Sequence, residues 1–108
     1  QTKKLFMNIS ILTPDRKVFI GSIESVTVPG TSGLFQIKQN HAPLVSSLVS
    51  GSVKLMTQGE YALYSTEKGE LEEGLNERRE ISFDIEGGFV EVLRNEISLL
   101  VQGVGKLN

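Results

Sequence analysis

Apolar and polar residues alternate with a period of two along most of this chain. The apolar members are Ile9 and Ile11; Val26 and Val28; Val53 and Leu55; Ile81, Phe83 and Ile85; and Ile97, Leu99 and Val101, the last three alternating with Ser98, Leu100 and Gln102. Successive side chains of a strand point to opposite faces of its sheet. Each run therefore predicts a half-buried antiparallel strand with one apolar face turned inward.

Residues typical of turns separate these runs. They are Pro14-Asp15, Pro29-Gly30, Gln58-Gly59, Gly87-Gly88 and Arg94-Asn95. Pro29-Gly30 predicts a type II turn, because proline presets φ at the first central position and glycine accepts the positive φ at the second. Many short strands with regular turns are typical of a sandwich or barrel. An all-β fold, an antiparallel β-sandwich of two layers, is the simplest way to bury so many one-sided strands.

One segment, residues 66–80, breaks the alternation. It is strongly charged and contains Gly69 and Gly74, so a stable helix is not expected there. We interpret it as a charged insertion that forms a solvated hairpin tip or loop, in preference to a binding arm. The expected organisation is an N-terminal extension (1–6), one β-sandwich domain (7–102) and a short tail (103–108). Six residues with two glycines cannot form a helical hairpin, so no C-terminal helical domain is predicted.

Composition narrows the class of protein. With 108 residues, 39% of them hydrophobic, the chain fits one domain with one core. A net charge of −2 gives no sign of the clustered lysines and arginines that nucleic-acid binding requires. The apolar runs are too short to span a membrane. The N-terminal residues lack the apolar stretch of a signal peptide.

The side-chain inventory argues against catalysis. The absence of cysteine excludes disulfides and cysteine-ligated metals, and it agrees with a reducing compartment. His41 is the single histidine, which excludes a zinc site with several histidine ligands. Beside Pro43, in a turn that leads into a strand, it is more typical of a hydrogen-bonded turn residue. Without a phosphate loop, a nucleophile elbow or an oxyanion donor set, we predict no catalytic, metal or cofactor site and no enzyme.

The most specific stretch runs from Val28 to Leu44 and reads VPGTSGLFQIKQNHAPL. Upstream stand ILTPD (11–15) and FIG (19–21), and downstream stands IEGGFVEV (85–92). Together, in this order and over residues 7–102 except the charged insertion, these motifs resemble the epsilon subunit of bacterial-type (F-type) ATP synthases. The resemblance is to its N-terminal β-sandwich domain, in a short form without the C-terminal helical hairpin. Asn40 stands where many members have glycine, and asparagine tolerates the left-handed conformation that such a turn needs.

The resemblance implies a fold of about ten strands and a non-catalytic role on the central stalk, or rotor. Such a subunit joins the c-ring to the gamma subunit, so that rotation driven by ion flow reaches ATP synthesis. The implied c-ring contacts are Thr31, Ser32, Gly33, Leu34 and His41, and the implied gamma contacts are Leu44 and Ser46. The implied location is the cytoplasmic face of the bacterial inner membrane, peripheral through the complex. Without the helices, nucleotide binding is not expected.

A second class of function stays open from the residues alone. A stand-alone β-sandwich could serve as a binding module for a peptide, a glycan or another ligand. With two tyrosines and no tryptophan, the chain offers little for a sugar-binding platform. A hydrolase built on His41 is the least supported alternative, because no nucleophile can be identified for it.

Overall fold

The computed structural model describes residues 7–64, 71–74 and 78–105, and every regular element within these ranges is a strand. The strands are β1 (Met7–Leu12), β2 (Lys17–Gly30), β3 (Gly33–Lys38), β4 (Leu44–Leu48), β5 (Gly51–Tyr64), β6 (Leu71–Gly74), β7 (Glu80–Ile85), β8 (Gly87–Leu93) and β9 (Glu96–Gln102). The described part thus contains nine of the roughly ten strands expected. It contains no helix of the length and apolarity needed to cross a membrane.

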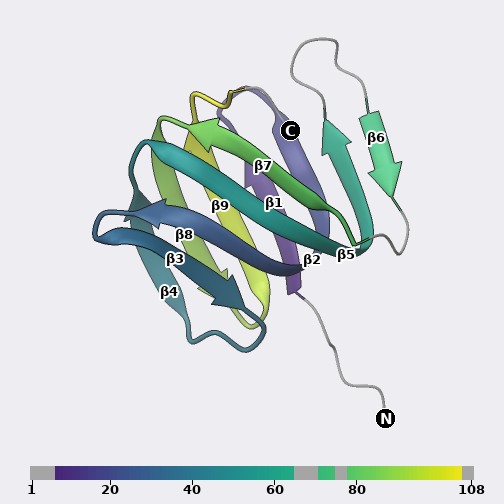
Figure 1. Ribbon diagram of the computed structural model, residues 1–108, viewed down its shortest axis with the longest axis horizontal. Helices are drawn as coiled ribbons and strands as arrows, with labels where there is room; N and C mark the ends of the chain where they lie inside the picture. The colour runs from purple at the N-terminus through teal and green to yellow at the C-terminus, as the bar shows by residue number, and fades with distance from the viewer. Residues whose placement is uncertain (1–6, 65–70, 75–77, 106–108) are drawn as a thin grey trace.

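The strands form two layers, which confirms the all-β sandwich (Figure 1). One layer is built from β4, β8, β9 and β1, with β1 and β9 paired in parallel and the other pairs antiparallel. The other layer contains β3, the second half of β2, the first half of β5, and β7. The first half of β2 pairs with β1, so the long strands β2 and β5 link the two layers.

The prediction of a turn at Gln58-Gly59 is wrong, because the chain bends there within a strand. β5 continues through these residues to Tyr64 instead of ending there. Its pairing with β2 shifts register on both sides of Ile23, and Gly59 has a φ of 94°. Extra residues in one strand of a ladder bend that strand and increase its twist. Gly59 lies in a bulge that allows β5 to pass from one layer to the other. From the local sequence alone, a glycine in such a bulge cannot be distinguished from a glycine in a turn.

The turn expected at Pro29-Gly30 lies two residues further along. The β2–β3 ladder continues to the pair Gly30–Gly33, and Thr31 and Ser32 form the turn. The positive φ, 120°, belongs to Gly33 and not to Gly30. Gly30 is required for space instead, because a Cβ atom there would lie 2.8 Å from the ring of Phe35.

Of the three remaining turn predictions, Pro14-Asp15 does lie at the bend between β1 and β2. The other two have different outcomes. Arg94 and Asn95 do form the β8–β9 turn, with φ values of 52° and 64°. Gly87 and Gly88, in contrast, belong to β8, and the bend before them is at Glu86. Gly88 has a φ of 149°, and a Cβ atom there would lie 2.2 Å from the carbonyl oxygen of Leu100. This glycine therefore permits close approach of β9, which local sequence does not reveal.

The charged insertion is partly a strand. Its residues 71–74 form β6, which pairs with the end of β5 from Tyr61 to Tyr64. Because β5 extends to Tyr64 and pairs antiparallel with these residues, the hairpin alternative fits this part of the segment and the loop alternative does not. The expectation for residues 66–70 and 75–77 lies outside the described residues, as does that for residues 1–6. In the tail, the Gly105 N–H donates to the Asp84 carbonyl oxygen at 2.9 Å.

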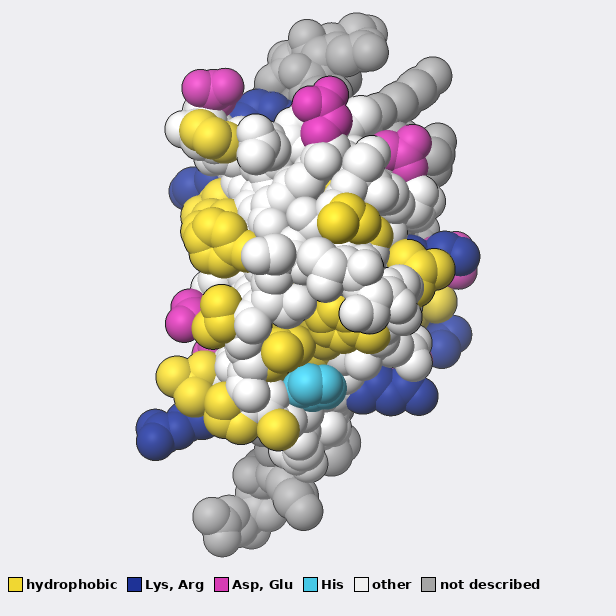
Figure 2. Space-filling model, turned by 90° about the vertical axis from the view of Figure 1, so that its left-hand side faces the viewer, with side chains coloured by type: hydrophobic (Ala, Val, Ile, Leu, Met, Phe, Trp, Pro, Cys, Tyr) yellow, Lys and Arg dark blue, Asp and Glu magenta, His cyan; other side chains and the backbone are white. Residues whose placement is uncertain are grey.

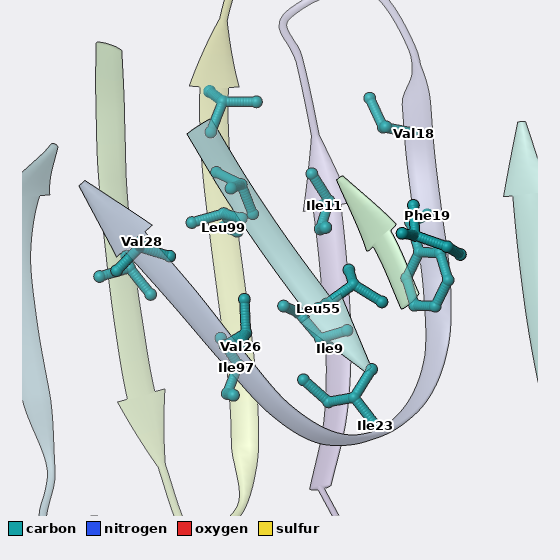
Figure 3. Close-up of a cluster of buried hydrophobic side chains, with 14 of the residues drawn as sticks. Ile9, Ile11, Val18, Phe19, Ile23, Val26, Val28, Leu55, Ile97 and Leu99 are labelled. Carbon is teal, nitrogen blue, oxygen red and sulfur yellow. The ribbon is translucent and has the colours of Figure 1, made fainter. Parts of the chain in front are cut away.

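The core lies between the layers and is formed by the inward-facing positions of the alternating runs. Figure 3 shows side chains from β1, β2, β5 and β9 that meet there, including Ile9, Val26 and Leu55. All twelve apolar residues singled out by the alternation are buried, as predicted. Thr57 is the one buried polar residue among the described residues, and its hydroxyl accepts a hydrogen bond from the Arg79 N–H at 2.8 Å. The scaffold therefore holds its outer surfaces on a well-packed centre.

Candidate partner-binding surfaces

The β2–β3 hairpin presents four of the predicted c-ring residues at its tip. Thr31, Ser32 and Gly33 are exposed in the two-residue turn and at the start of β3. Leu34 follows with 69% of its surface exposed. The next residue, Phe35, turns inward and packs against the core. The tip is therefore a firmly anchored turn that carries one large apolar side chain in solvent.

His41, the fifth predicted c-ring residue, lies in the loop between β3 and β4 and is half-buried. Its backbone N–H donates to the Lys38 carbonyl at 3.2 Å, and its Nδ1–H donates to the Ala42 carbonyl at 2.7 Å. Because a carbonyl only accepts, this contact assigns the proton to Nδ1 in the neutral ring and leaves Nε2 as an acceptor. His41 is thus a hydrogen-bonded turn residue whose ring reaches the surface (Figure 2).

The two parts of the predicted c-ring site lie at opposite ends of β3. The strand has six residues and separates its ends by about 17 Å. A partner that touches both Leu34 and His41 must therefore follow this edge of the sandwich along its length.

The two predicted gamma contacts lie on β4, and both face inward. Leu44 packs against the core, and Ser46 is half-buried with its hydroxyl donating to the Ser47 carbonyl at 3.2 Å. The alternation of the strand sends Val45 and Ser47 outward instead, and Val45 is 70% exposed. A partner that docks on β4 from outside therefore meets Val45 first.

An apolar surface that the sequence analysis missed lies on the outside of this layer. Leu12, Leu100 and Phe89 follow one another across β1, β9 and β8, since Leu12 pairs with Leu100 and Leu100 with Phe89. We name these three residues the outer apolar row. Phe89 is 46% exposed, and Leu100 is also exposed. A shallow groove of about 370 Å³ runs beside the row and is also lined by Pro14.

A signal for this row was present in the sequence. Leu100 occupies a position between Leu99 and Val101 where the alternation calls for a polar residue, so its side chain had to face outward. The pairing of Phe89 and Leu12 with Leu100 could not be read from the sequence, because it depends on which strands are neighbours.

The outside of the second layer is polar by comparison. One cross-strand row there consists of Gln36, Thr27, Lys54 and Ser82. The hydroxyl of Ser52 donates to Asp84 at 2.5 Å across the same face. Figure 2 shows the edge of the sandwich between the two faces: many hydrophobic side chains lie over the left and centre, while lysines and arginines lie on both sides, several of them along the right. A polar outer face is typical of a sheet that meets water.

An exposed ion pair between Arg78 and Glu24 lies beside the bend in β2. Arg78 donates from Nε and Nη2 to the two carboxylate oxygens of Glu24, at 2.9 and 2.8 Å. These hydrogen bonds, with the charge of Arg78, hold the pKa of the Glu24 carboxyl below its ordinary value of 4.5, against a smaller opposing effect of desolvation. Both groups are solvent-exposed, so the pair contributes little to stability.

Replacing Arg78 with alanine is expected to raise the pKa of Glu24 towards 4.5, and an NMR titration of the Glu24 side chain measures it. Because the folded-state pKa is the lower one, the pair stabilises the fold above the unfolded-state pKa, and this contribution is lost as pH falls through the folded-state value. Arg16→Ala is the control, since Arg16 donates to the Lys17 carbonyl and not to Glu24. An unchanged pKa in Arg78→Ala would show that this pair does not form in solution.

Within the described residues, no group of three or more His, Cys, Asp or Glu side chains could hold a metal ion. The described surface offers three features that could contact a partner: the outer apolar row, the exposed hairpin tip and the histidine loop.

Comparison with known proteins identifies the family. Residues 6–78 match the model of the ATP synthase delta/epsilon chain beta-sandwich domain. The chain is 40% identical over 96 residues to the ATP synthase epsilon chain of Chlorobium limicola and 38% identical to that of Chlorobaculum tepidum, covering 89% of each. It therefore belongs to the ATP synthase delta/epsilon family, among the epsilon chains.

Solved structures agree on the fold. A chain of the Euglena gracilis mitochondrial ATP synthase, in a structure of OSCP, F1 and the c-ring, superposes with a TM-score of 0.72 at 13% identity. That match covers 98% of this chain and 56% of the Euglena chain. A chain from the central stalk and c-ring of the Tetrahymena thermophila mitochondrial ATP synthase gives 0.65 at 18% identity, covering 97% and 69%.

Proposed function

We propose that this chain is a non-catalytic subunit of the central stalk of an F-type ATP synthase. In this role it joins the c-ring to the gamma subunit, so that rotation driven by ion flow reaches the sites of ATP synthesis. The complex would hold it at the cytoplasmic face of the bacterial inner membrane, as a peripheral component. The observation that carries the proposal is the outer apolar row, which is exposed on one face of a sandwich whose relatives are epsilon chains.

The outer apolar row and β4 are the proposed seat of the gamma subunit. Phe89 and Leu100 form an exposed apolar centre, and exposed apolar patches on small proteins mark interaction sites. On β4, Val45 adds another exposed apolar side chain, one outward position away from Ser47, which pairs with Phe89. Leu44 and Ser46 lie on the inward side of the same strand. An aromatic residue at the centre of such a patch is the usual anchor of an interface.

The β3 edge is the proposed contact with the c-ring. Thr31, Ser32 and Gly33 bring Leu34 to the tip of the hairpin, and His41 lies at the other end of the strand. Leu34 supplies an apolar contact beside a polar turn, and the His41 ring supplies a hydrogen-bond acceptor. The β2–β3 ladder holds Leu34, and a backbone hydrogen bond to Lys38 holds His41, which suits an element that transmits torque.

The first test is to mix the chain with its matching purified gamma subunit and measure the mass of the complex by size-exclusion chromatography with light scattering. We expect a stable one-to-one complex at micromolar concentration. If both proteins are folded and remain separate, the stalk function is refuted and a stand-alone binding module becomes the better interpretation.

Charged residues at both ends of β3 are expected to weaken coupling. In the assembled ATP synthase reconstituted in liposomes, the double variant Leu34→Glu, His41→Glu should pump fewer ions per ATP hydrolysed, because an unpaired charge at an interface is costly to desolvate. Lys17→Glu is the matched control, since with neutral His41 both variants change the net charge by two units and Lys17 is exposed at the start of β2. Full pumping by the double variant would contradict the proposed c-ring contact.

A further inference from the structure

Two asparagines on different loops meet beside His41. Asn40 lies in the β3–β4 loop, and Asn95 lies in the β8–β9 turn, 55 residues later. The Asn40 backbone N–H donates to the side-chain oxygen of Asn95 at 2.7 Å, and the Asn95 amide group approaches the Asn40 side-chain oxygen at 3.4 Å. Both residues have left-handed backbones, with φ values of 66° and 64°.

The backbone of Asn95 is itself held in place by a hydrogen bond. Its own backbone carbonyl accepts the Asn8 N–H at 3.0 Å, so the β8–β9 turn is fastened to the start of β1. The strand that follows the loop, β4, pairs with β8 from Leu44–Val92 onward. The hydrogen bond from Asn40 joins the loop to the β8–β9 turn immediately before His41.

We propose that Asn95 is a positioning residue: its side-chain oxygen fixes the β3–β4 loop through the Asn40 N–H and thereby fixes the direction of the His41 ring. The inference rests on the proposed function, since it assigns the His41 ring a partner to meet. A loop held in one conformation before binding loses less entropy when the partner docks. Asn95 itself need not touch that partner.

Three variants distinguish the effect of the Asn95 side chain from that of its backbone conformation. Asn95→Gly removes the side-chain oxygen but retains the left-handed backbone and the bond from Asn8, because glycine adopts positive φ freely. Asn95→Asp restores an acceptor in the same place. Asn40→Gly is the matched control, since it keeps the donating N–H and the backbone φ and loses only the longer side-chain contact.

The first measurement is amide hydrogen exchange of the whole chain by NMR, which does not depend on any partner. In Asn95→Gly the residue-40 amide should exchange about tenfold faster, as for the loss of one hydrogen bond, while Asn40→Gly and Asn95→Asp remain protected. The melting temperatures should stay close together. An unchanged exchange rate at Asn40 in Asn95→Gly would overturn the proposal and leave the stalk function untouched.

The second measurement is ion pumping per ATP in the reconstituted complex. We expect Asn95→Gly to lower it and Asn95→Asp to restore it, with Asn40→Gly near the unmodified value. If Asn95→Gly frees the loop but pumps normally, while charge at Leu34 and His41 impairs pumping, the positioning role is wrong and the stalk function stands. If neither set of variants affects pumping, the c-ring contact itself fails and the positioning role falls with it.

Discussion

Replacing Phe19 with alanine is expected to lower the free energy of unfolding by about 3–5 kcal/mol. Phe19 is fully buried on β2, and its ring stacks on that of Tyr61, with centroids 5.6 Å apart and planes at 16°. Phe19 lies on the first half of β2 and Tyr61 on the second half of β5, beyond the bends of both strands. Both belong to the buried core, so a cavity there removes packing from it. Urea unfolding followed by circular dichroism measures the change.

The same substitution at Phe89 provides the control. Phe89 is 46% exposed, and its replacement by alanine should cost about 1 kcal/mol or less. Natural domains have a total stability of about 5–15 kcal/mol, so Phe19→Ala should remain measurable as a marginally stable fold. Equal losses at the two positions would mean that the stack between Phe19 and Tyr61 is not a central part of the core.

Replacing Phe89 with aspartate is expected to weaken binding of the gamma subunit by at least about 2 kcal/mol, or about 30-fold in Kd. The ring is the largest side chain of the outer apolar row and lies between Leu100 and the outward-facing Ser47. Aspartate removes apolar contact and adds a charge that the interface must desolvate. Titration calorimetry with purified gamma subunit measures the effect.

Gln36→Asp is the matched control for this experiment. Gln36 is exposed on β3 in the polar outer face of the other layer, and the substitution adds the same single charge. The affinity of this variant for the gamma subunit should equal that of the unmodified chain. The melting temperatures of both variants should stay close to that of the unmodified chain. If Gln36→Asp weakens binding as much as Phe89→Asp, the gamma subunit is not seated on the outer apolar row.

Only part of the candidate site could be predicted from the sequence. Thr31 to Leu34 and His41 were assigned through their resemblance to epsilon chains, and the structure brings them to one edge, at opposite ends of β3. Leu44 and Ser46 were assigned in the same way, and both face inward. The exposed Phe89 and the bond between Asn40 and Asn95 were not found, because each joins segments far apart in the chain.

The sequence by itself determined the strand character, the buried face of each strand and the all-β sandwich class. These features depend on local alternation, and Ile9, Val53 and Leu99 are buried as their runs predict. It also predicted the β8–β9 turn, because asparagine tolerates a left-handed backbone.

Only the tertiary structure decided which glycines lie within strands and which lie in turns. Gly59 bends β5 between layers, and Gly88 makes room for β9, whereas both read locally as turn signals. It also decided that Leu100 joins Phe89 in an exposed row, since strand order sets which outward side chains become neighbours. A side chain's face follows from its own strand, but its neighbours follow from the packing of the whole chain.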